Sequence, residues 1–300
     1  MQKPLVHTTV LLHESIDGLL VHPGDIYLDG TLGSGGHALC ALEKTRGSIT
    51  VIGLDRDAEA LKRSEERLKG FKNVVLKEAS YAELDTVLDE LNIRKVQCIM
   101  LDLGLSSDQF ETSGRGFTFK NDEPLLMTFK KDLVEGDLTA KVIVNTWEEG
   151  NLADVIYGYG EERYARRIAR GIAQYREKKE IETTQELVEI ISSSVPIFYR
   201  RGRLHPATRT FQALRIAVND ELNTLKKGLE KGFEKLDSKG RMAVISFHSL
   251  EDRIVKNFYK EKAEEGKGII QTKRPLTASS KEVSENPRSR SAKLRIIEKI

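Results

Sequence analysis

The chain has 300 residues, of which 39% are hydrophobic and 31% are charged, and its formal net charge is +2. This length can bury one large core or two smaller ones. No apolar run approaches the roughly 18 residues of a membrane span, and His7 and Glu14 interrupt any signal-peptide pattern at the N-terminus. Cys40 and Cys98 have no metal-ligand spacing. We therefore expect a cytoplasmic protein with no membrane partner and no metal.

Strand and helix signals alternate through the first hundred residues. Short apolar runs predict strands at residues 26–28, 50–54, 74–76 and 98–101. Helical spacing begins at Ala38 and covers residues 81–91. This alternation favours a parallel sheet with crossover helices.

The pattern then changes twice. Residues 105–135 lack a sustained period, and residues 137–195 read as mainly helical. A strand at 240–246 and a helix at 250–259 resume the sheet, and runs at 268–273 and 292–298 predict an antiparallel hairpin at its edge, with a polar stretch at 279–291 between them. The predicted fold is an α/β, Rossmann-like sheet domain of residues 1–109 and 206–300, interrupted by an inserted all-α subdomain of residues 110–205.

A glycine-rich loop joins the first strand to its helix. The stretch from Asp29 to His37 includes Gly33, Gly35 and Gly36, and glycine lets the backbone approach a ligand closely at a helix N-terminus. Asp55 ends the next apolar run, where a carboxylate can take the hydroxyls of a ribose. An ordinary tight turn is the alternative for the glycines. The loop also satisfies the nicotinamide fingerprint, which leaves a dehydrogenase open here.

Other candidate residues follow the predicted strands at the same edge of the sheet. Asp29, Asp55 and Asp102 each end an apolar run, and Tyr81 follows the third. Parallel strands gather such residues into one crevice. A carboxylate after the first strand suits a sulfonium or amino-acid group, and an aromatic ring suits an adenine face. This set fits S-adenosylmethionine better than NAD, which has a pyrophosphate to hold.

Two aromatic residues lie beyond the fourth strand, in the segment from Arg115 through Phe117 to Phe119. Methylating an exocyclic base amine needs an acceptor for its N–H, and an aromatic face can hold a flipped base. Asp102 is the candidate acceptor and catalytic residue. Packing against the helical insertion is the equally weighted alternative for Phe117 and Phe119.

Positive charge is concentrated between residues 199 and 215. This stretch holds Arg200, Arg201, Arg203, Arg209 and Arg215 and no acidic residue, which favours a nucleic-acid partner. The arginines of residues 163–179 have Glu161, Glu162 and Glu177 interspersed or adjacent, and this stretch reads as a solvated helix face.

One further histidine is a candidate. His248 follows the last core strand, where it is a candidate base, while Ser249 is the default helix cap.

Characteristic motifs occur along nearly the whole chain, at residues 7–12, 29–37, 55–57, 102–107 with Gln109, 115–117, 159–163, 205–215, 247–256 and 286–291. Together they resemble one family, the bacterial small-subunit ribosomal RNA (cytosine-N4)-methyltransferase H family.

The resemblance implies methyl transfer from S-adenosylmethionine to the exocyclic N4 amine of a cytosine in the decoding region of small-subunit (16S) ribosomal RNA. It implies a helical substrate-binding domain and cofactor contacts from the glycine loop and from four side chains after it. The candidate cofactor-binding residues are Gly33, Gly35, Gly36, His37, Asp55, Tyr81, Asp102 and Gln109. The candidate RNA-binding residues are Arg115, Phe117, Phe119, Arg201, Arg203, His205, Arg209, Arg215 and His248.

The expected partner is the ribosomal RNA within an assembled or late-assembly 30S particle, and a homodimer is left open. One departure concerns the base pocket. Where the family usually has Pro-Leu-Asp-Met-Arg-Met, this chain places Leu126 and Thr128 at the acidic and basic positions. The alternative to an enzyme is therefore a non-catalytic RNA-binding or ribosome-assembly protein on the same fold.

Overall fold

A computed structural model describes residues 9–104, 113–130 and 132–300 of the chain. The chain divides into two compact units. The sheet unit runs through Gly104 and resumes at Leu222–Ile300, and the helical unit is Leu105–Glu221.

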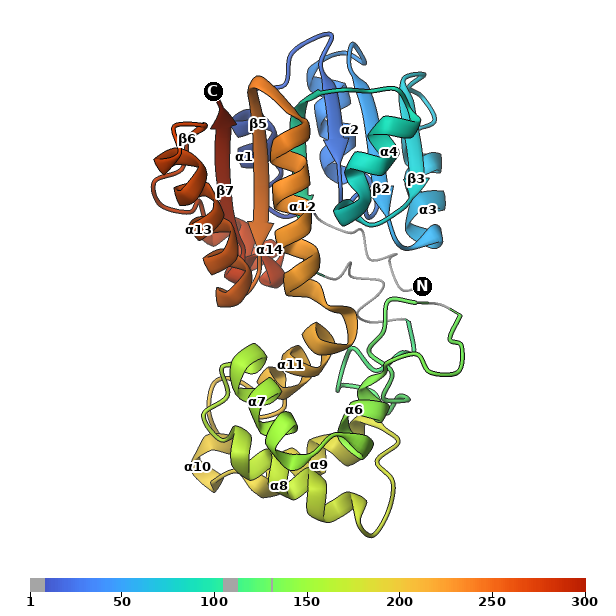
Figure 1. Ribbon diagram of the computed structural model, residues 1–300, viewed down its shortest axis with the longest axis vertical. Helices are drawn as coiled ribbons and strands as arrows, with labels where there is room; N and C mark the ends of the chain where they lie inside the picture. The colour runs from blue at the N-terminus through green and yellow to red at the C-terminus, as the bar shows by residue number, and fades with distance from the viewer. Residues whose placement is uncertain (1–8, 105–112, 131) are drawn as a thin grey trace. The chain divides into compact units, whose positions relative to one another are not determined.

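The sheet unit contains one mixed sheet with the strand order β3-β2-β1-β4-β5-β7-β6. Its β6 and β7 edge is coloured red in Figure 1 and its β3 edge blue-green. Pairing is parallel from β3 to β5, and β7 pairs antiparallel with β5 and β6. The strands are β1 (Ile26–Asp29), β2 (Thr50–Asp55), β3 (Val74–Glu78), β4 (Val96–Asp102), β5 (Leu236–Ser246), β6 (Gly268–Ile270) and β7 (Lys293–Lys299).

Helices cover both faces of this sheet. Neighbouring residues of each strand point to opposite faces, so the strands contribute apolar side chains to a core on each side. Tyr27 and Met100 lie in one apolar core with α1, α2 and α3, and Leu28 and Leu101 lie in the other with α4, α12 and α13. This is the predicted Rossmann-like α/β class. The helices of the unit are α1 (Leu12–Leu19), α2 (Gly36–Lys44), α3 (Ala58–Leu68), α4 (Leu84–Glu90), α12 (Glu221–Lys235), α13 (Ser249–Glu264) and α14 (Ser280–Glu285).

The helical unit is all-α apart from one isolated bridge between Pro124 and Thr183 within its described residues. Its core is formed by the apolar faces of helices α6 to α9 and α11, joined by Phe117, Leu125 and Met127 from the irregular segment before them. The helices, which run from green to orange in Figure 1, are α6 (Ala140–Thr146), α7 (Glu149–Gly160), α8 (Ala165–Arg176), α9 (Thr184–Ser194), α10 (Ile197–Arg200) and α11 (Thr208–Asn219).

The boundaries between the units differ from the expected ones. The sequence placed residues from 206 onward in the sheet domain, whereas α11 lies in the helical unit. The reason is packing: Phe211 and Leu214 of α11 are buried in the helical core. An amphipathic helix does not reveal from its sequence which of two cores it will join.

The predicted strands agree with the structure, and the late apolar runs form the antiparallel pair β6 and β7 at the sheet edge. The helix predicted at 81–91 starts as a short 3-10 turn, Tyr81–Glu83, before α4. The polar stretch 279–291 is not merely a connection, because it forms α14 and a 3-10 turn, Pro287–Ser291. No helix among the described residues is long and apolar enough to cross a membrane.

Candidate active site

The loop after β1 folds back onto the neighbouring strands. The Gly30 amide donates to the Met100 carbonyl of β4 at 2.9 Å, and the Leu32 amide donates to the Leu54 carbonyl of β2 at 2.9 Å. Gly33 and Gly35 have φ values of 53° and 74°, in the region that favours glycine. The loop therefore crosses the carboxyl ends of β1, β2 and β4, where ligands of such sheets bind.

Glycine is also required at Gly36, the first residue of α2. A Cβ atom there would lie 1.9 Å from the Oγ1 atom of Thr9. No side chain of the described residues caps α2. Because residue 36 has no Cβ atom, the first amides of α2 and the buried His37 can lie close to the loop.

Asp55 holds the loop in place from the end of β2. Its Oδ2 atom accepts from the Gly33 amide at 2.8 Å, and its Oδ1 atom accepts from the Asp57 amide at 2.9 Å. Burial raises the pKa of Asp55, and these two hydrogen bonds oppose the increase. Each carboxylate oxygen can accept a second hydrogen bond, so the residue can hold the loop and contact a ribose together.

Asp29 and Asp102 end the neighbouring strands β1 and β4. Asp29 is 2% exposed, and burial raises its pKa to about 7. The pKa of Asp102 is raised well above the ordinary range, first by burial and then by the charges of Asp29 and Glu251. Asp102 Oδ1 is buried and has no hydrogen-bond partner among the described residues. Such a pair of acids is suited to a cationic group, which would stabilise both carboxylates.

Thr31 links these two acids. Its amide donates to Asp29 Oδ1 at 3.2 Å, and its hydroxyl accepts from the Asp102 amide at 2.6 Å. The loop therefore fixes the position of both strand ends as well as its own.

Tyr81 is half-buried and packs closely between β1 and α12. A Cβ atom on Gly30 would lie 2.9 Å from Tyr81 Cβ, and one on Gly228 would lie 2.4 Å from Tyr81 Cδ2. Tyr81 therefore packs beside the glycine loop in a space that requires glycine at residues 30 and 228.

His248 has a local structural role that the sequence assigned to Ser249. His248 is the N-cap of α13, and its Nδ1 atom accepts from the Glu251 amide at 3.4 Å. Glu251 in return accepts from the Phe247 amide at 2.8 Å and the His248 amide at 3.3 Å. The expected Ser249 cap is therefore wrong, and the reciprocal capping box fixes the imidazole.

In the helical unit, Arg115 and Phe117 stabilise their own segment. Arg115 donates to the Phe129 carbonyl at 2.9 Å, and its guanidinium lies 5.5 Å from the centre of the Phe117 ring. Phe117 is 4% exposed within the helical core and stacks on Phe129 at 5.6 Å. Of the two interpretations that the sequence left open for Phe117, its burial favours packing over base stacking.

Phe119 and His205 form a stacked pair, with ring centres 4.6 Å apart and planes within 20°. The other contact of Phe119 is edge-on to Phe211 at 5.2 Å. Burial lowers the pKa of His205, which favours a neutral imidazole at physiological pH. The pair brings together two of the candidate RNA-binding residues.

The candidate arginines of the helical unit fall into two groups. Arg215 forms a two-bond ion pair with Glu221 at 2.8 and 2.9 Å, and Arg209 donates to the Glu161 carbonyl at 2.9 Å. Arg201 and Arg203 are exposed, and their side chains have no ion-pair or hydrogen-bond partner in the described parts of the chain. The charge of Arg215 is therefore neutralised locally by Glu221.

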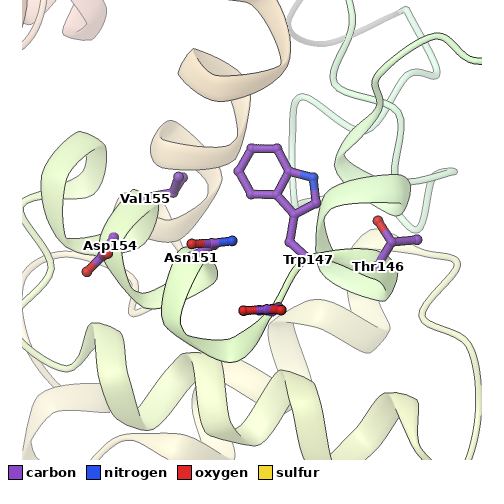
Figure 2. Close-up of a pocket in the computed structure, with 6 residues that line it drawn as sticks. Thr146, Trp147, Asn151, Asp154 and Val155 are labelled. Atoms are coloured by element: carbon purple, nitrogen blue, oxygen red, sulfur yellow. The ribbon is translucent and has the colours of Figure 1, made fainter.

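A cavity of about 480 Å³ opens where α6 meets α7. Figure 2 shows the Trp147 indole standing at this junction, with the Asn151 side chain directed toward it. The cavity is lined by Thr146, Trp147, Glu148, Asn151, Asp154 and Val155. Its two carboxylates disfavour a phosphate group here.

Residues 4–300 match the sequence model of the MraW methylase family. The chain belongs to this family. A relative from Coprothermobacter proteolyticus named ribosomal RNA small subunit methyltransferase H is 45% identical, over 100% of this chain and 98% of the relative. A Kosmotoga olearia protein of the same name is 47% identical, over 98% of this chain and 97% of the relative. A solved rRNA methylase from Streptococcus thermophilus is 12% identical with a TM-score of 0.47, covering 97% of this chain and 98% of that one.

This MraW methylase is an S-adenosylmethionine-dependent methyltransferase. This family membership overturns the alternative interpretation as a nicotinamide-dependent dehydrogenase, which the glycine loop alone left open. Gln109 and the neighbouring motif residues 105–108 lie outside the described residues, as does His7.

Sequence reasoning missed several residues that hold the site together. Thr31 lies within the glycine loop, and its position there could have indicated a residue that forms hydrogen bonds with Asp29 and Asp102. Ser64 of α3 donates to the Gly33 carbonyl at 2.7 Å, and Gly228 makes room for Tyr81. The last two contacts are distant in the chain, so no local pattern signals them.

Proposed function

We propose that this MraW methylase methylates the N4 amine of a cytosine in the decoding region of small-subunit ribosomal RNA. The name of its relatives supports the RNA substrate, and the motif resemblance supports the cytosine. The observation that carries the proposal is the buried Asp102 Oδ1 beside Asp29 at the glycine loop, which has no hydrogen-bond partner among the residues that the structure describes. Ribosomal RNA as substrate also implies a cytoplasmic site of action.

The residues around the loop fit S-adenosylmethionine, which supplies an electrophilic methyl group on a sulfonium when bound. Asp55 would accept from the ribose hydroxyls, and Tyr81 would contact the adenine. Gly33, Gly35, Gly36 and His37 would line the loop side. Asp29 and Asp102 would take the cationic methionyl part, which explains two buried acids at one place. Gln109 is proposed to complete this set.

Asp102 is also our candidate for the catalytic acceptor. The N4 lone pair of cytosine is delocalised into the ring, so attack on the methyl carbon is assisted when a group accepts an N4 hydrogen. When bound, S-adenosylmethionine would supply the methyl group, and its sulfur would keep the electron pair of the broken carbon–sulfur bond. Asp102 would accept the proton that N4 loses as the bond to the methyl carbon forms. A neighbouring cation would favour the ionised form of Asp102, which is the form that accepts.

The helical unit is proposed to bind the RNA. Phe119 stacked on His205 offers an aromatic surface for a base, and Arg201 and Arg203 offer unneutralised charge for phosphates. Arg115, Phe117, Arg209, Arg215 and His248 would then support the RNA-binding surfaces, because their described contacts are to the protein. The substrate would be a small subunit or a late assembly intermediate.

The departures at Leu126 and Thr128 lie in a packed segment. The neighbouring Leu125 and Met127 are at most 1% exposed, and Thr128 is 4% exposed. The Thr128 hydroxyl accepts from the Lys130 amide at 3.2 Å. This packing gives Thr128 a structural role in the helical unit, and the Leu126 carbonyl accepts from the Ala140 amide at 2.9 Å. Both roles are compatible with an active enzyme.

The test is transfer of labelled methyl from S-adenosylmethionine to small subunits that lack the modification, followed by mass spectrometry of the digested nucleosides. The expected product is N4-methylcytidine at a single position. Label on another atom or another base would contradict the proposed target. RNA binding without any label would support the non-catalytic alternative.

A further inference from the structure

An exposed tip of the helical unit combines apolar and basic side chains. Ile197 and Phe198 of α10 are 65% and 66% exposed, and Leu204 is 54% exposed. Large apolar side chains grouped at a surface mark an interaction site more often than single ones do. We define the α10 tip as Ile197, Phe198, Arg200, Arg201, Arg203 and Leu204.

The charge of the α10 tip is not neutralised locally. Arg201 and Arg203 have no acidic partner among the described residues, and the Arg200 guanidinium donates to the Val195 carbonyl at 3.3 Å. No acidic residue occurs between residues 199 and 215 of the chain. The tip therefore carries a concentrated positive charge that is suited to phosphate groups.

A buried contact fixes the base of the tip. The Tyr199 hydroxyl donates to Glu162 Oε2 at 2.6 Å, and Glu162 is fully buried. The Arg163 guanidinium lies 5.0 Å from the Tyr199 ring and 4.9 Å from the Tyr164 ring. These contacts hold one side of α10 against the residues between α7 and α8. Ile197 and Phe198 remain on the exposed side of this helix.

We propose that the α10 tip binds an unpaired nucleotide of the RNA, with Phe198 stacked on its base and Arg201 and Arg203 on the adjacent phosphates. This inference rests on the proposed RNA substrate and adds a contact outside the reacting site. Single-stranded RNA presents flat bases beside phosphates, which matches an exposed aromatic ring followed closely in the chain by arginines. A protein partner would need acidic groups to match the three arginines, and it is an outcome of the test.

The experiment compares Phe198→Ala with Tyr157→Ala, a matched control because Tyr157 of α7 is 68% exposed in the same unit. Affinities are measured for a single-stranded ribosomal RNA fragment and for unmodified small subunits. Stacking on one base is worth roughly tenfold in affinity, so Phe198→Ala should weaken RNA-fragment binding about tenfold, and Phe198→Trp should retain it. Tyr157→Ala should bind as wild type, and S-adenosylmethionine affinity should be unchanged in all three.

The charge contribution is tested with the Arg201→Ala and Arg203→Ala double variant. Loss of two phosphate contacts should reduce the slope of log affinity against log salt by about 1.4. Wild-type RNA-fragment binding by both Phe198→Ala and the double variant would overturn the proposal. Loss of particle binding with intact fragment binding would also overturn it, in favour of a protein partner. A wild type that binds the fragment but does not methylate subunits would contradict the proposed function and leave the fragment result interpretable.

Discussion

The Asp55 carboxylate at the end of β2 accepts a hydrogen bond from the Gly33 amide at 2.8 Å, so one acid both fixes the glycine loop and faces the candidate cofactor site. Its second oxygen holds the Asp57 amide at 2.9 Å. The conformation of the loop and the position of the proposed ribose acceptor are therefore coupled through one side chain.

Substitution of Asp55 by alanine should affect binding and stability together. The two amides would lose their acceptor, which costs about 1–3 kcal/mol in the free energy of unfolding for buried groups. We expect S-adenosylmethionine affinity to fall by at least about tenfold, since one charge-assisted contact is worth that much. Titration calorimetry and chemical denaturation measure the two effects. Asp89→Asn, on the exposed end of α4, is the control, and a variant at Asp55 that binds normally would refute the assigned role.

The pH dependence of stability should reflect Asp29. Its folded pKa of about 7 lies above the ordinary value of 3.8, so the unfolded chain releases this proton more readily. The stability of the cofactor-free protein should therefore fall as the pH rises from about 4 to about 7, by at most about 4 kcal/mol from this group. Asp102 acts in the same direction.

Denaturation at pH 5 and pH 8 measures this effect. Asp29→Asn should reduce the difference, because its side chain cannot ionise, while Asp17→Asn on the exposed surface should leave it as in the wild type. A wild type that is more stable at pH 8 than at pH 5 would argue against two buried acids. Binding of a cationic cofactor should strengthen over the same interval, because it favours the ionised carboxylates.

Two glycine substitutions should have opposite effects on stability. Gly36→Ala places a Cβ atom 1.9 Å from Thr9 Oγ1, so the first turn of α2 or residue 9 must move. Gly150→Ala meets nothing within 4 Å in α7 and should stabilise by up to about 1 kcal/mol through helix propensity. Thermal unfolding distinguishes them. Equal effects of the two substitutions would mean that the Gly36 contact is relieved without cost.

The sequence was informative where the chemistry is local. The Gly33 amide and the Asp55 carboxylate lie in contact, as their spacing indicated, because a strand, a tight turn and the next strand end fix one another. Phe117 and Arg215 were harder to interpret, since an aromatic ring near a predicted site and an arginine in a basic stretch have the same sequence signal when buried or exposed. Burial of Phe117 in the helical core and the partner Glu221 of Arg215 depend on tertiary packing.

The ion pair of Arg215 gives a prediction that separates structure from RNA binding. Both side chains are mostly buried, at 16% and 12% exposed, so Arg215→Ala leaves the Glu221 charge without this partner. We expect a loss of about 1–3 kcal/mol in the free energy of unfolding. The salt dependence of RNA binding should be unchanged, in contrast to the Arg201 and Arg203 variant. A lower salt slope in Arg215→Ala would instead indicate a phosphate contact.

The most direct test of the account is single-turnover methyl transfer to unmodified small subunits by wild type and Asp102→Asn at saturating S-adenosylmethionine. We expect the single-turnover rate of methyl transfer to be reduced about 10²- to 10⁴-fold in Asp102→Asn, because the amide is a poorer proton acceptor than the carboxylate. Cofactor saturation is verified by titration in the same samples. A variant that methylates at the wild-type rate would contradict the placement of Asp102 at the reacting centre.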